Sequence, residues 1–540
     1  MNSLWIILIS IIIFSIAYVT YGAWLAKQWG VDPSRKTPAH TKNDGVDYVP
    51  AKAPVLLGHH FASIAGAGPI VGPISAAVFG WVPVMLWIII GGIFFGGVQD
   101  FGSLFASIRH DGKSIGEVIE VNMGKTGKKL FGLFAWLTLL LVVAAFTNIV
   151  ANTFVSVPAA ASASMLFIVL AVVFGFAVYR KGVSLTIGSV VGVILLFLCI
   201  ALGNIFPLAL SKNVWVAILL VYIFIASVTP VWILLQPRDY LNSYLLYAML
   251  IGAVVGLAVY RPEIQLPAVT SFNLGNGNLL FPMLFVTVAC GAISGFHSLV
   301  GSGTTSKQMD NEADAKIVGY GGMLIECVLA VIAIITAAYI TGDKFKELAG
   351  AGGPVNVFSD GIGVFMSKFG IPYPIGKSFV ALAVSAFALT SLDTGTRLAR
   401  FIFQEFFDDP TKETQNILAN RYVSTAITVA IGGWLALGSY TKIWPVFGSA
   451  NQLLAALALI AIAIWLKNSG KNYSMFIIPM IFMFVVTVFA LILLINTNLA
   501  AGNYVLVVFP ILLLILAFVL AYEAYKIFNN KTPIKPGAKA

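Results

Sequence analysis

Apolar runs long enough to cross a membrane recur from one end of this chain to the other, and no other feature constrains its fold more. Of the 540 residues, 59% are hydrophobic and 10% are charged. A helix needs about 20 apolar residues to cross the hydrocarbon core, where all backbone polar groups must be paired within the protein. The sequence therefore predicts an all-α polytopic membrane protein with no sizeable domain outside the membrane.

We predict about fifteen transmembrane helices. Residues 4–26 form the first, and we interpret this run as a retained helix because no basic residues precede it and it is longer than the apolar segment of a signal peptide. The stretch 341–376 is expected to carry a short interfacial or re-entrant helix. The other spans are predicted at 59–80, 82–108, 130–154, 162–179, 184–207, 214–236, 244–260, 281–300, 318–340, 377–400, 421–438, 443–466, 475–495 and 504–526.

The basic residues predict the orientation of these spans. The net charge is +10, and most of the 32 lysines and arginines fall on alternate loops, such as 27–52 and 109–129. Because cytoplasmic loops are enriched in Lys and Arg, we predict the amino terminus outside and the carboxyl terminus in the cytoplasm. We expect this positive charge to face anionic membrane lipid and not nucleic acid.

The second predicted span cannot be one continuous helix. Gly66, Gly68, Pro69 and Pro73 lie within it, and these residue types weaken or break helical hydrogen bonding. Interrupted helices at membrane depth are tolerated where protein or a water-filled cavity receives their free backbone groups, and they mark the binding centres of many secondary transporters. Gly66, Ala67, Gly68 and Pro69 are therefore candidates for binding substrate or ion.

The order of the spans predicts two inverted five-helix units of the LeuT or APC type, each beginning with a broken helix. The second break would then lie at Ser227–Pro230. The glycine-rich end of the span at 281–300 is the alternative place for it, and the sequence leaves both open. The preferred division is a first helix and basic loop at 1–58, a first unit at 59–207, a second unit at 208–407 and accessory helices at 408–540.

Histidines and serines in apolar surroundings are further candidates for substrate contact. His59 and His60 begin the second span, and neighbouring helical residues point about 100° apart, so a shared metal ion is not expected. They are either interfacial residues or take part in proton relay or substrate contact. His297 is flanked by Ser294 and Ser298 in a glycine-rich apolar segment, which favours functional contact.

Carboxyl groups inside predicted spans are functional candidates because hydrocarbon does not tolerate an unpaired charge. Asp100 either takes part in ion coupling or anchors Arg109. Glu326 has no cation at a neighbouring helical position, so it is either a protonated coupling carboxyl or a silent, hydrogen-bonded one. We predict that Asp100, Glu326 or His297 carries the coupling proton.

Charged residues near the inner ends of two spans predict a gate. Arg238 and Asp239 lie at the inner end of the span at 214–236. Asp393 and Arg397 are four residues apart on a predicted helix, a spacing that suits an ion pair on one helix face. We interpret these four residues as an ion-pair latch, with substrate contact as the alternative.

No pattern indicates an enzyme or a metal site. Neither an HExxH motif nor paired CxxC motifs occur, and Cys199, Cys290 and Cys327 lie in apolar spans without metal-ligand spacing. We therefore predict no catalytic residue, no metal site and no cofactor, with protons or Na⁺ as the coupling ion. The sequence makes no prediction of the oligomeric state.

Six segments between residues 54 and 466 form an ordered set: GHHFASIAGAGPIVGP, VQDFGSLFASIRHDGKSIGE, LLQPRDYLNSYLL, CGAISGFHSLVGSGTTSKQ, TSLDTGTRLARFIFQEF and WPVFGSANQLLAALAL. In this order they resemble the signature blocks of the carbon starvation protein A family of bacterial inner-membrane carriers. The resemblance implies a secondary transporter that imports small peptides or, in some members, pyruvate, with protons and by alternating access during carbon limitation. It assigns no role to single residues. A nutrient-sensing receptor or a channel is the alternative class.

Overall fold

The computed structural model describes residues 2–45, 48–230, 233–275, 277–407, 416–438 and 440–529. Over these residues the chain is helical, and its extended pairings are isolated bridges such as that of Asn2 with Glu263. Twelve of the described helices are long and apolar enough to cross a membrane, and the bent pair α4–α5 makes a thirteenth span. The predicted all-α, multi-pass class is therefore confirmed.

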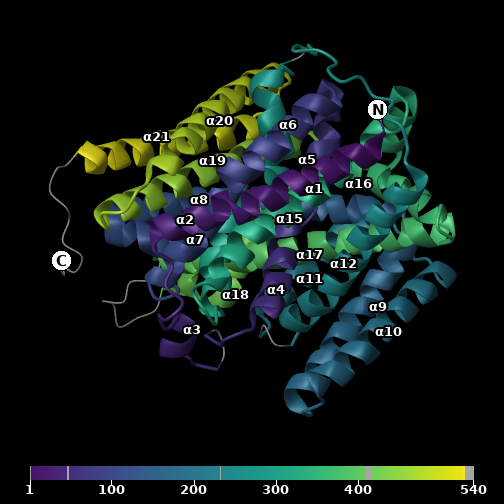
Figure 1. The fold of residues 1–540 in the computed structure, drawn as a ribbon, viewed down its shortest axis with the longest axis horizontal. Helices are drawn as coiled ribbons and strands as arrows, with labels where there is room; N and C mark the ends of the chain where they lie inside the picture. Colours follow the sequence, from purple (N-terminus) through teal and green to yellow (C-terminus); the bar gives the residue numbers. More distant parts are fainter. Residues whose placement is uncertain are drawn as a thin grey trace.

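The helices follow the predicted spans in chain order (Figure 1). The first span is α1 (Ser3–Val19) with α2 (Tyr21–Trp29), followed by the short α3 (Pro38–Thr41). Next come α4 (Ala53–Ala65), α5 (Gly68–Ala76), α6 (Trp81–Gly91), α7 (Gly97–Arg109), α8 (Ile115–Ser156), α9 (Pro158–Gly175), α10 (Leu185–Ile205), α11 (Lys212–Val228) and α12 (Leu235–Tyr260). The second half contains α13 (Phe285–Val288), α14 (Gly295–Gly303), α15 (Gly322–Ala338), α16 (Gly342–Ser367), α17 (Tyr373–Phe407), α18 (Arg421–Ala436), α19 (Tyr440–Asn468), α20 (Ser474–Ala500) and α21 (Val505–Asn529).

Two of the fifteen predicted spans correspond to short helices, since α11 has 17 residues and α18 has 16. The number fifteen therefore stays a prediction. The predicted span at 214–236 is not one helix, because α11 ends at Val228 and α12 begins at Leu235. Pro230 thus follows the end of a helix and does not interrupt one, while residues 231–232 lie outside the described part of the chain. The stretch 341–376 carries α16, which is kinked at Gly352 and Gly353.

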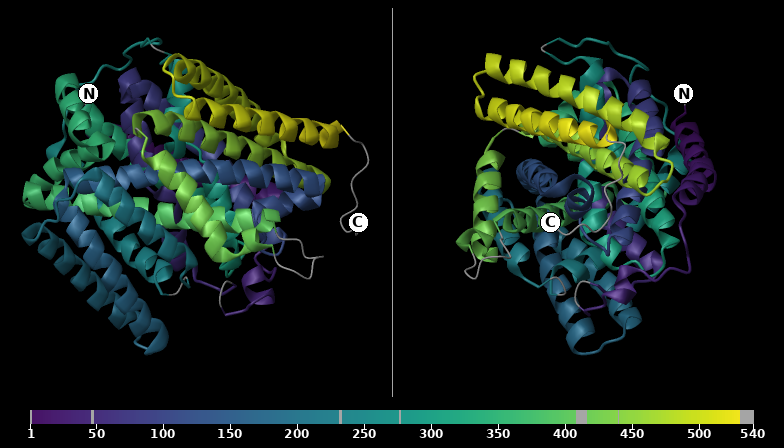
Figure 2. Two further views of the ribbon diagram at one scale, coloured as in Figure 1. Left: turned by 180° about the vertical axis from the view of Figure 1, so that it is seen from behind. Right: turned by 90° about the vertical axis from the view of Figure 1, so that its left-hand side faces the viewer.

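The long helices α8 and α17 pack along each other at the centre of the bundle, and α8 also contacts α18 and α19. The apolar stretches of α17 and α19 are almost wholly buried, whereas those of α1, α10 and α20 are less than half buried and suited to contact with lipid. The α9–α10 hairpin (blue) projects from one side of the bundle, and α20 and α21 (yellow) cover another (Figure 2). The polar candidates therefore lie inside a shell of lipid-facing helices.

Two interrupted helices run antiparallel through this core. One is α4–α5, and the other is α13–α14, which are separated by a 3₁₀ turn at Ala289–Gly291. The start of α4 lies beside the chain that follows α14, because Ala51 pairs with Met309. The end of α5 lies beside the loop that precedes α13, because the Val82 amide donates a hydrogen bond to the Ala268 carbonyl. Each interrupted helix therefore begins on the side where the other ends.

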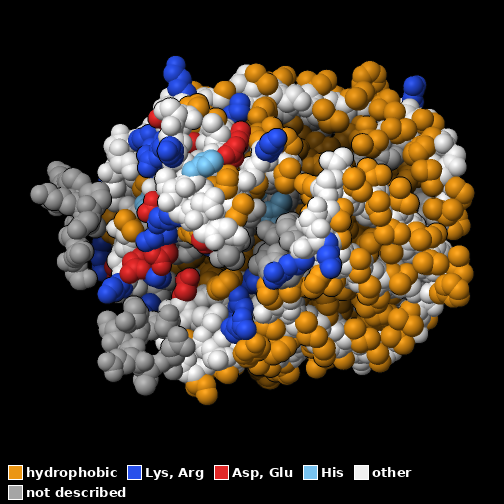
Figure 3. Space-filling view, turned by 90° about the horizontal axis from the view of Figure 1, so that it is seen from below, with side chains coloured by type: hydrophobic (Ala, Val, Ile, Leu, Met, Phe, Trp, Pro, Cys, Tyr) orange, Lys and Arg blue, Asp and Glu red, His pale blue; other side chains and the backbone are white. Residues whose placement is uncertain are grey.

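Charge divides the surface as the loops predict. Lysines, arginines and acidic residues gather toward one end of the molecule, and hydrophobic side chains cover most of the rest (Figure 3). The amino terminus lies beside the loop at 262–263, while the end of α21 lies beside Lys467. The start of α1 and the end of α21 are at opposite ends of the bundle (Figure 2).

Candidate functional site

The two helix interruptions meet each other. A Cβ atom built on Gly68 would lie 2.7 Å from the Cys290 Sγ, and one built on Gly72 would lie 2.1 Å from the Val288 carbonyl oxygen. Glycine at these positions lets the backbone of α5 approach the second interruption more closely than any side chain permits. The predicted candidates Gly66, Gly68 and their neighbours are all buried at this junction.

The interruptions share an unusual backbone conformation. Gly66, after the last turn of α4, has φ +28° and ψ −153°, and Ala289, after α13, has φ +44° and ψ −122°. This region suits glycine and strains a residue that carries a Cβ atom. The second break is therefore held against the preference of its own residue by the packing around it.

Ala289→Gly is expected to stabilise the protein by about 1 kcal/mol, because it removes this strain at the cost of extra freedom in the unfolded chain. The thermal unfolding midpoint of the detergent-purified protein measures the effect. Ala292→Gly is the matched control, since Ala292 has φ −129° and gains no relief. A midpoint that falls equally in both variants would contradict the strain at Ala289.

Asn451 of α19 holds the start of α14. Its Oδ1 accepts a hydrogen bond of 2.8 Å from the Phe296 amide, and its Nδ2 donates one of 3.0 Å to the Ser294 hydroxyl. Ser298 donates to the Gly295 carbonyl in the same turn. The amide therefore satisfies backbone and hydroxyl groups that the break exposes, which is the interhelical hydrogen bonding expected of such residues in membranes.

Three predicted proton-coupling candidates come together beside this junction. Nδ1 of His297 lies 2.8 Å from Oδ2 of Asp100, in hydrogen-bonding distance, and Nε2 lies 3.5 Å from Oε2 of Glu326. The side chains of all three are at most 1% exposed. Asp100 comes from α7, His297 from α14 and Glu326 from α15. About 200 residues separate Asp100 from His297 in the chain, and about 30 separate His297 from Glu326. We call these residues the coupling triad.

The coupling triad has capacity for a proton. Within the described part of the chain, the oxygens of Glu326 have no hydrogen-bond partner. Only one of the two oxygens of Asp100 has such a partner. Two carboxylates around one imidazole leave an excess negative charge even when His297 is charged, and burial makes an excess charge costly. Proton binding removes that excess. Asp100 does not anchor Arg109, whose guanidinium instead binds Glu312, with an Nη2–Oε1 distance of 2.6 Å.

The adjacent histidines point to different neighbours. His60 is buried, and its Nδ1 lies 2.8 Å from the Thr305 hydroxyl. Its ring also lies over Gly322 at the start of α15. His59 is half-buried and is close enough to Asp239 for their charges to interact. Since the two rings face different elements, they do not form one site.

A second buried cluster joins α11, α12 and α17. The Arg238 guanidinium binds the carboxylates of Asp393 and Asp239 and lies 2.5 Å from the Tyr222 hydroxyl. Thr390 donates a hydrogen bond of 3.0 Å to Oδ1 of Asp239. We call Arg238, Asp239, Asp393, Tyr222 and Thr390 the arginine cluster. It brings together three of the four residues predicted to form a latch.

The predicted ion pair between Asp393 and Arg397 is wrong. Asp393 points to Arg238 on α12, whereas Arg397 donates hydrogen bonds of 2.8 and 2.6 Å to the carbonyls of Ala226 and Thr229. Arg400 likewise donates to Ser227. The guanidinium groups bind the carbonyl end of α11, where the helix dipole favours positive charge. This tertiary contact overrides the local spacing of four residues.

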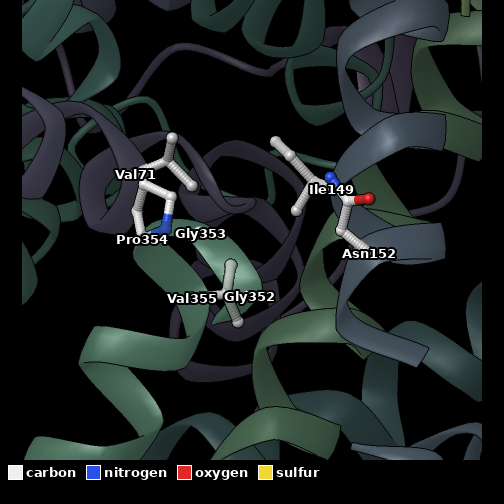
Figure 4. Close-up of a pocket in the computed structure, with 7 residues that line it drawn as sticks. All are labelled: Val71, Ile149, Asn152, Gly352, Gly353, Pro354 and Val355. Carbon is white, nitrogen blue, oxygen red and sulfur yellow. The ribbon is translucent and has the colours of Figure 1, made fainter. Parts of the chain in front are cut away.

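A small cavity of about 20 Å³, which has room for about one water molecule, lies beside α5. Val71 of α5, Ile149 and Asn152 of α8, and the kink of α16 at Gly352–Val355 line it. Figure 4 shows Val71 and Pro354 on one side of this space, facing Ile149 and Asn152. The kink of α16 therefore covers the approach to α5.

Sequence reasoning did not select Tyr222, Thr390 and Cys290 as site residues. The first two lie in ordinary apolar helices, and nothing in their local sequence predicts a buried arginine as their partner. Cys290 lies in an apolar span without metal-ligand spacing, yet its Sγ lies 3.4 Å from the Ser294 hydroxyl at the helix break. Its place inside the predicted span at 281–300, directly before the glycine-rich segment, is the one available signal. Among the described residues, no group of three or more His, Cys, Asp or Glu side chains has the arrangement of a metal site.

A bundle of apolar helices in which two interrupted helices meet beside a buried charged centre defines a multi-pass membrane carrier as the class of this protein. The model of the carbon starvation protein CstA family matches residues 2–353 and 346–490. The chain belongs to that family, and the predicted family is confirmed.

Several relatives are similar over most of their length. The peptide transporter CstA of Bacillus subtilis (strain 168) is 34% identical, with 97% of each chain covered. The peptide transporter CstA of Escherichia coli (strain K12) is also 34% identical, over 88% of this chain and 78% of that protein. The pyruvate/proton symporter BtsT of the same strain is 33% identical, over 91% and 81%. These relatives are named as transporters.

A solved structure shows the same kind of fold. A manganese transporter from Eremococcus coleocola superposes with a TM-score of 0.50, at 11% sequence identity, over 90% of this chain and 99% of that chain. At this identity the likeness concerns the fold alone.

Proposed function

We propose that this protein is a proton-coupled secondary transporter that imports a small carboxylate-bearing solute, a short peptide or pyruvate, across the bacterial inner membrane. The observation that carries the proposal is the coupling triad at the junction of two interrupted helices. Because the triad is buried, a change in its net charge is costly unless the surrounding structure moves as well. The broken helices are the elements that can move. Proton binding and helix movement are therefore linked.

Two inverted five-helix units account for this arrangement. The first contains α4–α5, α6–α7, α8, α11 and α12, and the second contains α13–α14, α15, α17, α18 and α19. Equivalent contacts support the pairing: α4 packs against α12 as α13 packs against α19, and α8 packs against α18 as α17 packs against α11. The second unit then begins near residue 280 and not at 208, and the α9–α10 hairpin is an insertion into the first.

The positive-inside rule supports an external amino terminus and a cytoplasmic carboxyl terminus. In that orientation α4 and Arg397 lie toward the cytoplasm, and the cavity under the α16 kink opens toward the outside. The arginine cluster then lies on the cytoplasmic side of α17, where it holds α12 against α17. Its opening is the proposed step that releases substrate inward.

The relatives' names support two substrate classes, peptides and pyruvate. Both carry a carboxylate, which the positive end of a half-helix favours. The start of α14 is already capped by Asn451, so the start of α5 at Gly68 is the proposed place for that group. No bound cofactor is proposed, and the coupling ion is the proton because the coupling triad can hold one.

Uptake into proteoliposomes tests this function. Vesicles that contain the full-length protein are given labelled dialanine or labelled pyruvate, with and without an inwardly directed proton gradient. We expect one of these solutes to accumulate above its external concentration only when the gradient is present. Flux that equilibrates but never accumulates would identify a channel, and solute binding without flux would identify a receptor.

A further inference from the structure

The arginine cluster carries an unbalanced charge that the latch alone does not explain. One guanidinium faces two carboxylates, and the side chains of Arg238, Asp239 and Asp393 are at most 2% exposed. A buried excess negative charge costs several kcal/mol unless it is compensated. The charged and titratable groups around Asp393 are Arg238 and Asp239 on α12 and Tyr222 on α11. His59 on α4 lies close to Asp239, and Arg397, one turn along α17, binds the carbonyl end of α11.

The hydrogen bonds show which atom has spare capacity. Oδ2 of Asp393 accepts from both Arg238 and the Tyr222 hydroxyl, the latter at 2.9 Å. Oδ1 of Asp239 accepts from Arg238 at 3.0 Å and from Thr390 at 3.0 Å. Oδ1 of Asp393 is buried and has no hydrogen-bond partner among the described residues. A proton on this atom would leave every existing hydrogen bond in place.

We propose that the arginine cluster is a second proton-binding site, with Oδ1 of Asp393 as the atom that takes the proton. The inference rests on the proposed proton-coupled transport and extends it from one proton to two in each cycle. The neutral Asp393 carboxyl attracts the guanidinium less strongly than the carboxylate does, and the charge of Arg238 is then balanced by Asp239 on its own helix. Proton binding therefore loosens α12 from α17, and proton release fastens them.

The coupling triad has a similar composition, although the proposed repeat relates it to α4–α5, α7 and α15 and not to the arginine cluster. The coupling triad lies where α14 meets α7 and α15, and the arginine cluster lies where α17 meets α11 and α12. Each contains two carboxylates and one cationic side chain. Each has a carboxylate oxygen without a hydrogen-bond partner in the described part of the chain. Both sites therefore carry one more negative than positive charge when all their groups are ionised.

The number of coupled protons sets the limit of accumulation. With the membrane potential held at zero by potassium and valinomycin, a pH gradient of about one unit supports up to about tenfold accumulation for one coupled proton and about 100-fold for two. We expect about 100-fold for the wild-type protein with labelled dialanine or pyruvate, whichever it accumulates. Asp393→Asn should lower the limit to about tenfold, since the amide mimics a permanently protonated carboxyl.

Asp239→Asn supplies an independent test, because it leaves one carboxylate for one guanidinium and should also give about tenfold accumulation. Glu523→Gln, in an exposed pair with Lys526 on α21, is the control and should keep the wild-type limit. A wild-type limit near tenfold, or either aspartate variant that keeps about 100-fold, would overturn the second site.

If the wild-type protein accumulates neither solute, the proposed function fails, and infrared spectroscopy then decides the second site separately. We expect the purified protein at neutral pH to show the C=O band of a protonated carboxyl that Asp393→Asn removes and Glu326→Gln does not. Identical spectra for the wild-type protein and Asp393→Asn would reject the site.

Discussion

Glu326→Gln is expected to lower the accumulation of solute about tenfold when the pH gradient is about one unit, because one coupled proton is lost. The amide has nearly the shape of the protonated carboxyl and cannot release a proton. Within the described chain neither Glu326 oxygen has a hydrogen-bond partner, so the substitution breaks no hydrogen bond and removes only the ionic contact with His297. Exchange of labelled for unlabelled solute at equal pH needs no net proton movement and should continue.

Glu326→Asp is the matched control, since it keeps a titratable carboxyl one methylene farther from His297. It should retain most of the gradient-driven accumulation. The double variant Glu326→Gln with Asp393→Asn should exchange solute but not accumulate it. If Glu326→Gln, Asp100→Asn and His297→Gln each accumulate solute as the wild-type protein does, the coupling triad does not carry the proton.

Gly72→Ala is expected to lower the free energy of unfolding by about 3 kcal/mol or more, which is at or above the usual cost of overpacking. The added methyl group would meet backbone and not a flexible side chain, since the Val288 carbonyl oxygen would lie 2.1 Å away and that of Thr287 2.8 Å away. The junction of the two interrupted helices must then separate. We expect both the thermal midpoint in detergent and solute exchange to fall.

Gly350→Ala separates this effect from a general intolerance of added side chains. Gly350 lies on α16, and a Cβ atom there meets nothing within 4 Å. Its thermal midpoint and exchange rate should match those of the wild-type protein. A Gly72→Ala protein with normal stability and exchange would show that α5 and α13 do not need their close approach.

Much of the fold was predictable because membranes restrict the choice of structure. Apolar runs located the helices, and Gly66–Pro69 located the first interruption without any tertiary information. The sequence left two places open for the second interruption and favoured Ser227–Pro230, since Pro230 is a stronger local signal than Ala289. Ala289 takes a glycine-like conformation under packing from α5 and α19, which a propensity argument cannot foresee.

The sequence predicted which residues belong to the candidate site better than it predicted which of them contact each other. Asp100, His297 and Glu326 each stood out as polar residues in apolar spans, and the fold brings them together across three helices. The partner of Asp393 was missed, because local spacing favoured Arg397 while the nearest guanidinium comes from α12. Helix spacing predicts neighbours on one helix and says nothing about a residue more than 150 positions away.

Proton movement driven by solute tests the central claim most directly. Proteoliposomes with no initial pH gradient, their membrane potential held at zero, are mixed with unlabelled solute while a dye reports the external pH. The account predicts that the medium becomes more alkaline as solute enters, in fixed proportion to the solute and less so per solute for Glu326→Gln. Solute entry through the wild-type protein with no change in external pH would contradict it.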